Sequence, residues 1–359
     1  MINNYTPFSF YVIHLITSFF PNSIVAGRIL SLVSIVFISL MSYGVARQLG
    51  AEKIYSFFSA LWFSATMFRG YTNYSGMNDP HLFGLALMTL GFYLFMRWRN
   101  TRLLYACFVV FVVGGLAKNS LFALPLAAIC ILFIERNDRR YRVLAFSLAC
   151  IALSTLFLYE LYGNLFFSQM FIPRTVEFYR IIGSLQRIQW LAIPLLFWAV
   201  SFRSFKRRQV KYVTAAMVVS GWLFWWMTGV VKGVGTNAIF ELAFSTSVAL
   251  ACAASAAFAT RLQVLGRTFT LGPIVFSLII LRLLASFDMA PYALLLDPSY
   301  RAEIERRANR VIEDVAFVRG SSKNVACSVM TVCYLAGKPY DLTAPRIVQR
   351  SEDKWSDKP

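Results

Sequence analysis

The chain has 359 residues, of which 58% are hydrophobic, 16% aromatic and only 14% charged, and its mean hydropathy is +0.59. A water-soluble globular enzyme is far more polar, so that class is excluded. The 35 Lys and Arg residues against 17 Asp and Glu residues give a net charge of +18, which in a soluble protein would suggest nucleic acid. Here most basic residues lie in loops between apolar runs, so the expected partner is membrane lipid and not nucleic acid.

The apolar runs predict a polytopic membrane protein. A helix crosses the bilayer core with about 20 apolar residues, and shorter helices serve where the protein buries part of their length. The hydropathy pattern predicts about ten spans, over residues 24–46, 55–69, 80–96, 103–117, 120–134, 141–161, 188–202, 212–231, 238–260 and 269–287. The predicted fold class is all-α, with a small α/β segment at the C-terminal end.

The basic residues predict the topology of these spans. Residues 103–134 form either one long helix or a hairpin broken at Lys118, and arginines flank both ends of the stretch. A hairpin puts both arginine clusters on one side of the membrane, as the positive-inside rule prefers, whereas a single span would separate them. We therefore expect the hairpin. The other strongly basic loops then fall on the same, cytoplasmic side, and the N-terminus and the C-terminal tail both lie outside, in the manner of a bacterial inner-membrane protein.

The segments outside the spans have separate expected structures. The run Phe8–Phe20 is too short to cross the membrane and is expected to be interfacial or re-entrant. Residues 162–187, rich in aromatic residues and arginine, suit an interfacial loop or a short amphipathic helix. The chain divides into a membrane domain, 1–290, and an outer tail, 291–359. In the tail, Ala302–Phe317 is predicted to be a helix and Asn324–Tyr334 a strand.

The six cysteines form no CxxC pair, so they predict no metal site. Cys327 and Cys333 both lie in the predicted strand of the tail. Six extended residues would separate them by roughly 20 Å, which is too far for a disulfide. Both are therefore expected to be free thiols.

Ionisable groups near the outer span ends are the candidates for chemistry, because charges at membrane depth are costly. Asp79 precedes Pro80 at the start of a span, where Asp is a good helix cap, but a carboxylate there can also hold a divalent metal ion or act as a general base. His81 could be a second metal ligand or a structural histidine. Glu241 lies just inside another span and is either salt-bridged to an outer arginine or part of a catalytic or metal site.

Lys118, at the tip of the predicted hairpin, is the main candidate for binding a phosphate. A cation beside Asn119 and Ser120 at a helix N-terminus forms an anion site, although a lysine at this depth can also simply reach to the interface. Arg69 and Arg174 could extend the same outer basic surface, but each alone is better explained by a contact to a lipid headgroup. Phosphate binding and lipid contact therefore both remain open for these residues.

Several short motifs, in this order along the chain, resemble those of the GT-C class of membrane glycosyltransferases, near the protein O-mannosyltransferases and the lipid A aminoarabinose transferase. These motifs are Tyr5-Thr6-Pro7-Phe8, Ala26-Gly27-Arg28-Ile29-Leu30-Ser31-Leu32, Asn78-Asp79-Pro80, Gly115-Leu116-Ala117-Lys118-Asn119, Gly235-Thr236-Asn237 with Glu241-Leu242, and Leu335-Ala336-Gly337-Lys338-Pro339. The resemblance implies transfer of a sugar from a polyprenyl phosphate to a lipid, glycan or protein acceptor at the outer face. It also implies an acidic catalytic position at Asp79, a phosphate contact at Lys118 and a supporting acidic role for Glu241.

The resemblance has one departure. In that class a first span and an outer loop with the main acidic motif would come before Tyr5, so the chain is expected to be an incomplete or divergent member. Two other readings stay open: a transporter or flippase that binds lipid phosphates, and an inactive remnant. Transporters commonly carry inverted repeats and polar groups at mid-depth, and neither is evident in this sequence.

Overall fold

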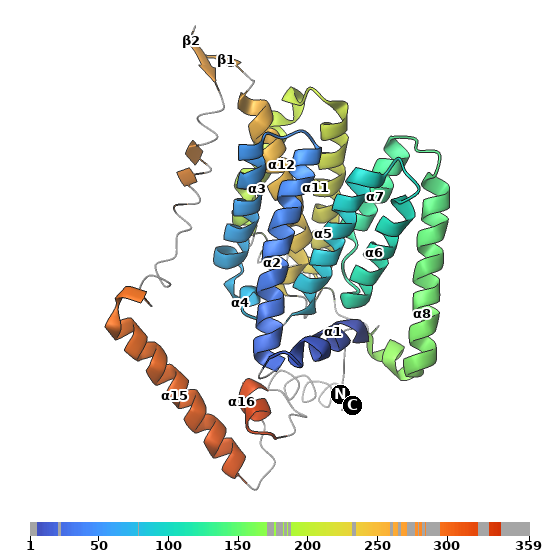
Figure 1. Cartoon of the computed structure of the whole chain (residues 1–359). Coiled ribbons are helices and arrows are strands. Elements are labelled where there is room, and N and C mark those ends of the chain that lie inside the picture. Colours follow the sequence, from blue (N-terminus) through green and yellow to red (C-terminus); the bar gives the residue numbers. More distant parts are fainter. Residues whose placement is uncertain are drawn as a thin grey trace, which may run out of the picture. The chain divides into compact units, whose positions relative to one another are not determined.

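In the computed structural model, the described residues are 6–20, 23–77, 79–170, 188–231, 235–258, 261–264, 267–270, 295–321 and 330–338, with a few single positions between these ranges. The chain separates into two compact units, residues 2–287 and residues 288–359. The first unit is a helical bundle, shown in Figure 1. Each unit is described below by itself.

The bundle follows the apolar runs of the sequence. Its helices and turns are α1 (Pro7–Thr17), α2 (Ser23–Gln48), α3 (Lys53–Ala65), η1 (Thr66–Gly70), α4 (Thr72–Ser75), α5 (Pro80–Trp98), α6 (Leu104–Ala117), α7 (Ala123–Ile134), α8 (Arg140–Met170), α10 (Gln189–Ser201), η2 (Phe202–Ser204), α11 (Arg208–Gly229), η3 (Thr236–Ile239) and α12 (Phe240–Phe258). The break between α6 and α7 confirms the predicted hairpin at Lys118.

Four helical stretches among the described residues are long and apolar enough to cross a membrane: Ser23–Gln48, Pro80–Trp98, Arg140–Asn164 and Thr236–Ala257. The all-α membrane fold is thus observed, but ten spans are not confirmed. The hairpin helices α6 and α7 have 14 and 12 residues. At 1.5 Å per residue they extend only about 20 Å, against a hydrocarbon core of about 30 Å.

The predicted last span is only partly described. Its first residues belong to β2 (Arg267–Thr270), which pairs with β1 (Arg261–Val264) in an antiparallel hairpin. The predicted start of this span at residue 269 is therefore wrong, because residues 269 and 270 belong to a strand. Most of the remainder of 269–287 lies outside the described residues.

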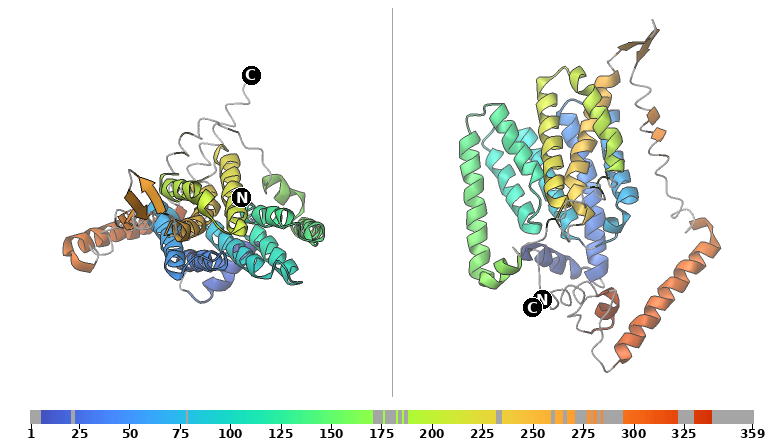
Figure 2. Two further views of the ribbon diagram at one scale, coloured as in Figure 1. Left: turned by 90° about the horizontal axis from the view of Figure 1, so that it is seen from above. Right: turned by 180° about the vertical axis from the view of Figure 1, so that it is seen from behind.

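Helix α12 lies at the centre of the bundle and α8 at its edge, as Figures 1 and 2 show. The most apolar 18 residues of the span Thr236–Ala257 are 89% buried. The corresponding share in Arg140–Asn164 is 11%. The sequence of α12 is rich in Ala and Ser, which lets neighbouring helices approach closely. Its buried hydroxyls bond to carbonyls one turn back, as Ser245 does to Glu241 O at 2.8 Å. The central helix therefore carries polar groups without leaving them unpaired.

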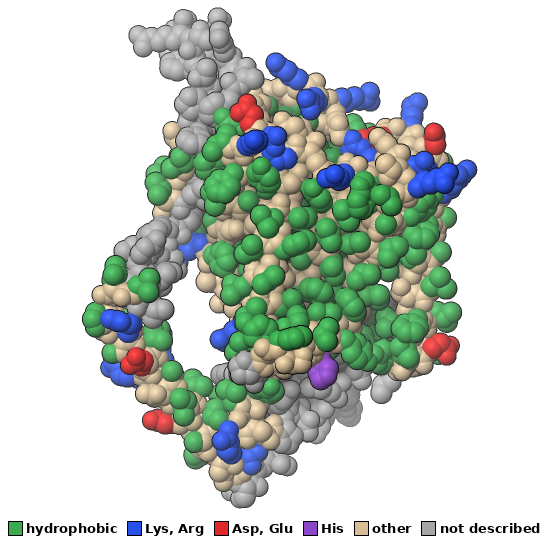
Figure 3. Space-filling view, in the orientation of Figure 1, with side chains coloured by type: hydrophobic (Ala, Val, Ile, Leu, Met, Phe, Trp, Pro, Cys, Tyr) green, Lys and Arg blue, Asp and Glu red, His purple; other side chains and the backbone are tan. Residues whose placement is uncertain are grey.

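The two ends of the bundle differ in charge. Figure 3 shows Lys and Arg side chains gathered at the end where α2 finishes and α3 begins, with an apolar belt below them. At the opposite end, α1 runs across the bundle (Figures 1 and 2). It is tied there by Thr6, whose hydroxyl donates to Leu116 O, and by a ring contact between Phe8 and Phe83 at 6.2 Å. The interfacial position expected for this segment stays a prediction.

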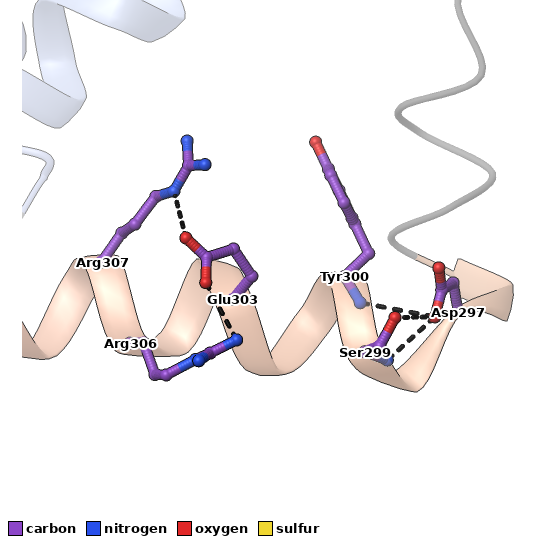
Figure 4. A network of polar contacts seen from close by, with 6 residues as sticks. All are labelled: Asp297, Ser299, Tyr300, Glu303, Arg306 and Arg307. Carbon is purple, nitrogen blue, oxygen red and sulfur yellow. Dashed lines mark hydrogen bonds and ion pairs between the residues drawn. The ribbon is translucent and has the colours of Figure 1, made fainter.

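The second unit is described over α15 (Pro298–Gly320) and α16 (Met330–Leu335). Asp297 caps α15 by accepting hydrogen bonds from the amides of Ser299 (2.8 Å) and Tyr300 (3.4 Å), and Pro298 occupies the first helical position. One turn on, Glu303 pairs with Arg306 and Arg307, both at 2.9 Å (Figure 4). The predicted helix in this region is therefore confirmed, and it is longer than expected at both ends.

Two predictions for the tail are wrong. Met330–Leu335 is helical and not extended, because Cys333 and Ala336 on one helical face pack against Val318 of α15. Residues 324–329 of the predicted strand lie outside the described residues. Cys333 is disulfide-bonded and so is not the free thiol that we expected. The expectation assumed an extended backbone throughout this segment, whereas the backbone at Cys333 is helical.

Candidate functional site

The end of the bundle opposite the basic loops carries most of the predicted site residues. Asp79 stands there as the N-cap of α5 and is 8% exposed. Its Oδ1 accepts a hydrogen bond from the backbone N–H of His81 at 2.9 Å. The sequence favours this arrangement because Asp satisfies a free amide of the first turn and Pro80 has no amide to satisfy. The capping role considered for Asp79 is therefore present.

The second oxygen of Asp79 has a partner that sequence reasoning gave no role. Asn237, in η3, donates from Nδ2 to Asp79 Oδ2 at 3.2 Å. This contact joins two segments that are 158 residues apart. Gly235, at the start of η3, lies so close to Tyr74 that an added Cβ would be 2.3 Å from the Tyr74 hydroxyl. The motif Gly235-Thr236-Asn237 was the available signal, since its glycine permits this close approach.

His81 is buried beside Asp79, with 3% of its surface exposed. Its ring meets Phe240 edge-on, with centroids 5.4 Å apart. Tyr71 and Tyr74 also contact Phe240, at 5.3 and 5.1 Å. Among the described residues neither ring nitrogen of His81 has a hydrogen-bond partner. Such unpaired buried polar groups are rare and call for an explanation.

Lys118 lies at the end of α6, against the face of α5 that carries His81. A Cβ on Gly84, three residues after His81, would lie 3.1 Å from Lys118 Cβ. Residues three apart on a helix share a face, so Lys118 and His81 belong to the same side of α5. Three of the predicted site residues, Asp79, His81 and Lys118, thus lie close together.

Glu241 lies at the start of α12, and its hydrogen-bond partners are ones that the sequence did not predict. Its Oε1 accepts a hydrogen bond from the backbone N–H of Leu124 at 3.1 Å, and the amides of Phe122 and Ala123 also face the carboxylate. The side chain is 4% exposed. Glu241 therefore caps the N-terminus of α7 from a separate helix, and its observed partners are amides and not an outer arginine. The same contact occupies an amide of the helix end where we expected a phosphate, because the free N–H groups there attract any nearby anion.

Of the two arginines in the predicted site, the structure describes only Arg69. Arg69 is exposed in η1, a π-helical turn at the end of α3. Arg174 lies outside the described residues. The basic surface expected from these two residues is therefore described only in part.

A metal site is not assembled by the described residues alone. Among them, no group of three or more His, Cys, Asp or Glu side chains is placed to hold a metal ion. Asp79 and His81 are neighbours, but the Asp79 oxygens accept from an amide and an asparagine, and the His81 ring packs on Phe240. A metal role for this pair stays a prediction.

Comparison with known proteins adds a family match over part of the chain and a similar fold. Residues 4–159 match the family model described as dolichyl-phosphate-mannose-protein mannosyltransferase. No curated protein matches the chain. The fold is similar to the crystal structure of ArnT from Cupriavidus metallidurans in the apo state, with a TM-score of 0.57 and 14% sequence identity over 88% of this chain. The chain spans 59% of the length of that protein.

Proposed function

This chain resembles the GT-C class of membrane glycosyltransferases in the sequence of its N-terminal part and in its fold, and from that premise we propose that it transfers a sugar from a polyprenyl-phosphate donor. The acceptor is a lipid, a glycan or a protein, and the transfer takes place at the outer face of the membrane. The observation that carries the proposal is the group formed by Asp79, His81 and Lys118 at one end of the bundle.

The charge distribution supports an outer location for this group. Lys and Arg gather at the other end of the bundle (Figure 3), and loops rich in these residues stay on the cytoplasmic side. The end with Asp79 then faces outward. Disulfide bonding of Cys333 agrees with an oxidising compartment for the tail. We propose the bacterial inner membrane on the same grounds.

The proposed sugar transfer requires a base and a group that stabilises the leaving phosphate. In the proposed reaction the acceptor hydroxyl attacks the anomeric carbon of the sugar, its proton passes to the Asp79 carboxylate, and the bond from that carbon to the phosphate oxygen breaks. The Lys118 ammonium stabilises the negative charge that remains on the lipid phosphate. Asn237 holds Asp79 Oδ2 and so orients the carboxylate for this task.

The test separates the capping role of Asp79 from its proposed chemical role. Asp79→Asn keeps a good N-cap, and the Asn237 amide can turn over to accept from the new NH2 group, so we expect the protein to retain its melting temperature while transfer of a labelled sugar from polyprenyl phosphate falls by about 10² to 10⁴-fold. Asp79→Ala should lower both transfer and stability, the latter by about 0.5–2 kcal/mol. Wild-type transfer by the folded Asp79→Asn variant would show that the residue is only a cap.

Lys118 provides the matching test for the donor. Lys118→Ala should weaken binding of a polyprenyl phosphate by about 1.5–3 kcal/mol, the usual scale of a hydrogen bond to a charged group, and Lys118→Arg should retain much of the affinity. Titration of purified protein with the lipid phosphate measures both. Unchanged affinity in Lys118→Ala would leave this lysine as a contact to lipid headgroups.

A further inference from the structure

The His81 ring is the polar group at this end of the bundle that the folded protein leaves without a hydrogen-bond partner among the described residues. We propose that His81 and Lys118 together hold an anionic phosphate oxygen of the lipid-linked donor. This inference rests on the proposed function and adds a donor-binding residue to it. The ligand class is a phosphate ester of a long-chain alcohol.

The neighbouring acidic groups are already occupied, whereas the ring is not. Asp79 accepts from the His81 amide and from Asn237, and Glu241 accepts from the amide of Leu124. His81 uses its backbone N–H for the cap, while both ring nitrogens are buried with no partner in the described part of the chain. Leaving a buried donor or acceptor unpaired destabilises the folded protein. A ligand atom that bonds to the ring recovers this free energy.

The position of Lys118 indicates the charge of that ligand atom. The close approach at Gly84 brings the Cβ of Lys118 against the face of α5 that carries the ring. An imidazole N–H and an ammonium group are both donors, so an oxygen that accepts from both is best matched by an anion. The apolar contact with Phe240 holds the ring edge-on and leaves it few alternative orientations. A phosphate oxygen meets these requirements better than an alcohol oxygen does.

The low exposure of the ring constrains how the ligand enters. At 3% exposure the ring is reached only when a neighbouring side chain moves. Lys118 is half-buried and its Cβ packs against the same helix, α5, so a phosphate that reaches the ring also comes near the lysine. The two residues should therefore act as a coupled pair.

The experiment measures binding of farnesyl phosphate and of farnesol to the full-length chain in detergent. His81→Phe keeps the aromatic contact with Phe240 but removes both ring nitrogens, so we expect farnesyl phosphate to bind about 10- to 100-fold more weakly and farnesol to bind unchanged. The free variant should melt at or above the wild-type temperature, because the unpaired groups are gone. His81→Gln, which keeps a donor and an acceptor, should lose less affinity.

Two controls give the result its meaning. His14→Phe changes an exposed histidine of α1 and should leave binding of both lipids unchanged. In a double-mutant cycle, His81→Phe and Lys118→Ala should lose less affinity together than the sum of their separate losses, since both hold one oxygen. Equal affinity of wild type and His81→Phe for farnesyl phosphate, or an equal loss for farnesol, would overturn the inference and leave the ring to packing or to a buried water. Wild-type protein that does not distinguish farnesyl phosphate from farnesol would instead overturn the proposed donor class itself.

Discussion

Buried acidic side chains at the proposed outer end serve first as helix caps. Asp79 caps its own helix, α5, and Glu241 caps a neighbouring one, α7. The first amides of a helix have no partner within it, and inside an apolar bundle no water replaces that partner. The same two carboxylates that the sequence offers as catalysts are thus required by the fold. Asp79 has, besides its cap, the neighbouring polar residues His81 and Asn237, which suit it to chemistry.

The role of Glu241 gives a test at this scale. Glu241→Ala leaves the amide of Leu124 buried and unpaired, so the free energy of unfolding should fall by about 1–3 kcal/mol. Glu241→Gln keeps a carbonyl acceptor, so its free energy of unfolding should fall less. Thermal unfolding in detergent measures both, with Glu160→Ala, an exposed acidic residue of α8, as the control that should not change. Loss of sugar transfer at wild-type stability in Glu241→Ala would restore the catalytic interpretation.

Close packing of α5 on α6 sets the relation between His81 and Lys118. A Cβ on Gly84 would lie 2.8 Å from Leu121 Cδ1 and 3.3 Å from Gly114 O, and one on Gly91 would lie 2.8 Å from Phe111 Cδ1. Small residues at such contacts let the backbones of membrane helices approach. At the other end of the hairpin, Arg99 pairs with Glu135 at 3.4 Å, and Tyr212 of α11 donates a hydrogen bond to the same carboxylate. The hairpin is thus anchored at both ends.

Substitution of the contact glycine should therefore disturb both packing and binding. Gly84→Ala forces α5 and α6 apart, and overpacking of this kind costs about 1–3 kcal/mol. The control is Gly115→Ala on the same hairpin, where the nearest atom to an added Cβ is 4.0 Å away. We expect Gly84→Ala to lower the melting temperature and weaken lipid-phosphate binding, and Gly115→Ala to change neither. Equal melting of the two variants would contradict the close approach.

The stability of helix α15 should depend on pH through its own carboxylates. Hydrogen bonds from the hydroxyl and amide of Ser299 lower the pKa of Asp297, and Arg307 and Arg306 lower the pKa of Glu303 (Figure 4). A carboxyl whose pKa is lower in the folded state stabilises that state above its unfolded pKa, and the contribution is lost as the pH falls through the folded value. Protection of the first turns of α15 against hydrogen exchange, corrected for intrinsic rates, should thus decline below about pH 4. Asp297→Asn with Glu303→Gln should flatten this dependence, and an unchanged profile would contradict it.

Across the whole molecule, the tail and the basic loops are expected to lie on opposite sides of the membrane. A reporter fused after Arg142 should lie in the cytoplasm and one fused after Arg319 outside, because the first follows a basic loop and the second precedes the disulfide-bonded Cys333. This outcome requires the chain to cross the membrane once more between Ala257 and Leu295. Cytoplasmic signals from both fusions would show either that the chain does not cross the membrane after Ala257 or that the predicted hairpin is wrong.

Local patterns were enough for much of this molecule. Runs of apolar residues marked the helices, the arginine clusters marked the hairpin at Lys118, and Asp79 before Pro80 marked a helix start, because each depends on near neighbours in the chain. The ordered motifs likewise pointed to the class of membrane glycosyltransferases that residues 4–159 match.

Tertiary structure alone decided the partners. The contact of Asn237 with Asp79 spans 158 residues, and that of Glu241 with Leu124 spans 117. The unpaired ring of His81 and the helical form of Met330–Leu335 likewise depend on what packs against them. No local periodicity encodes such contacts, because they arise from the free energy of burying distant segments against one another.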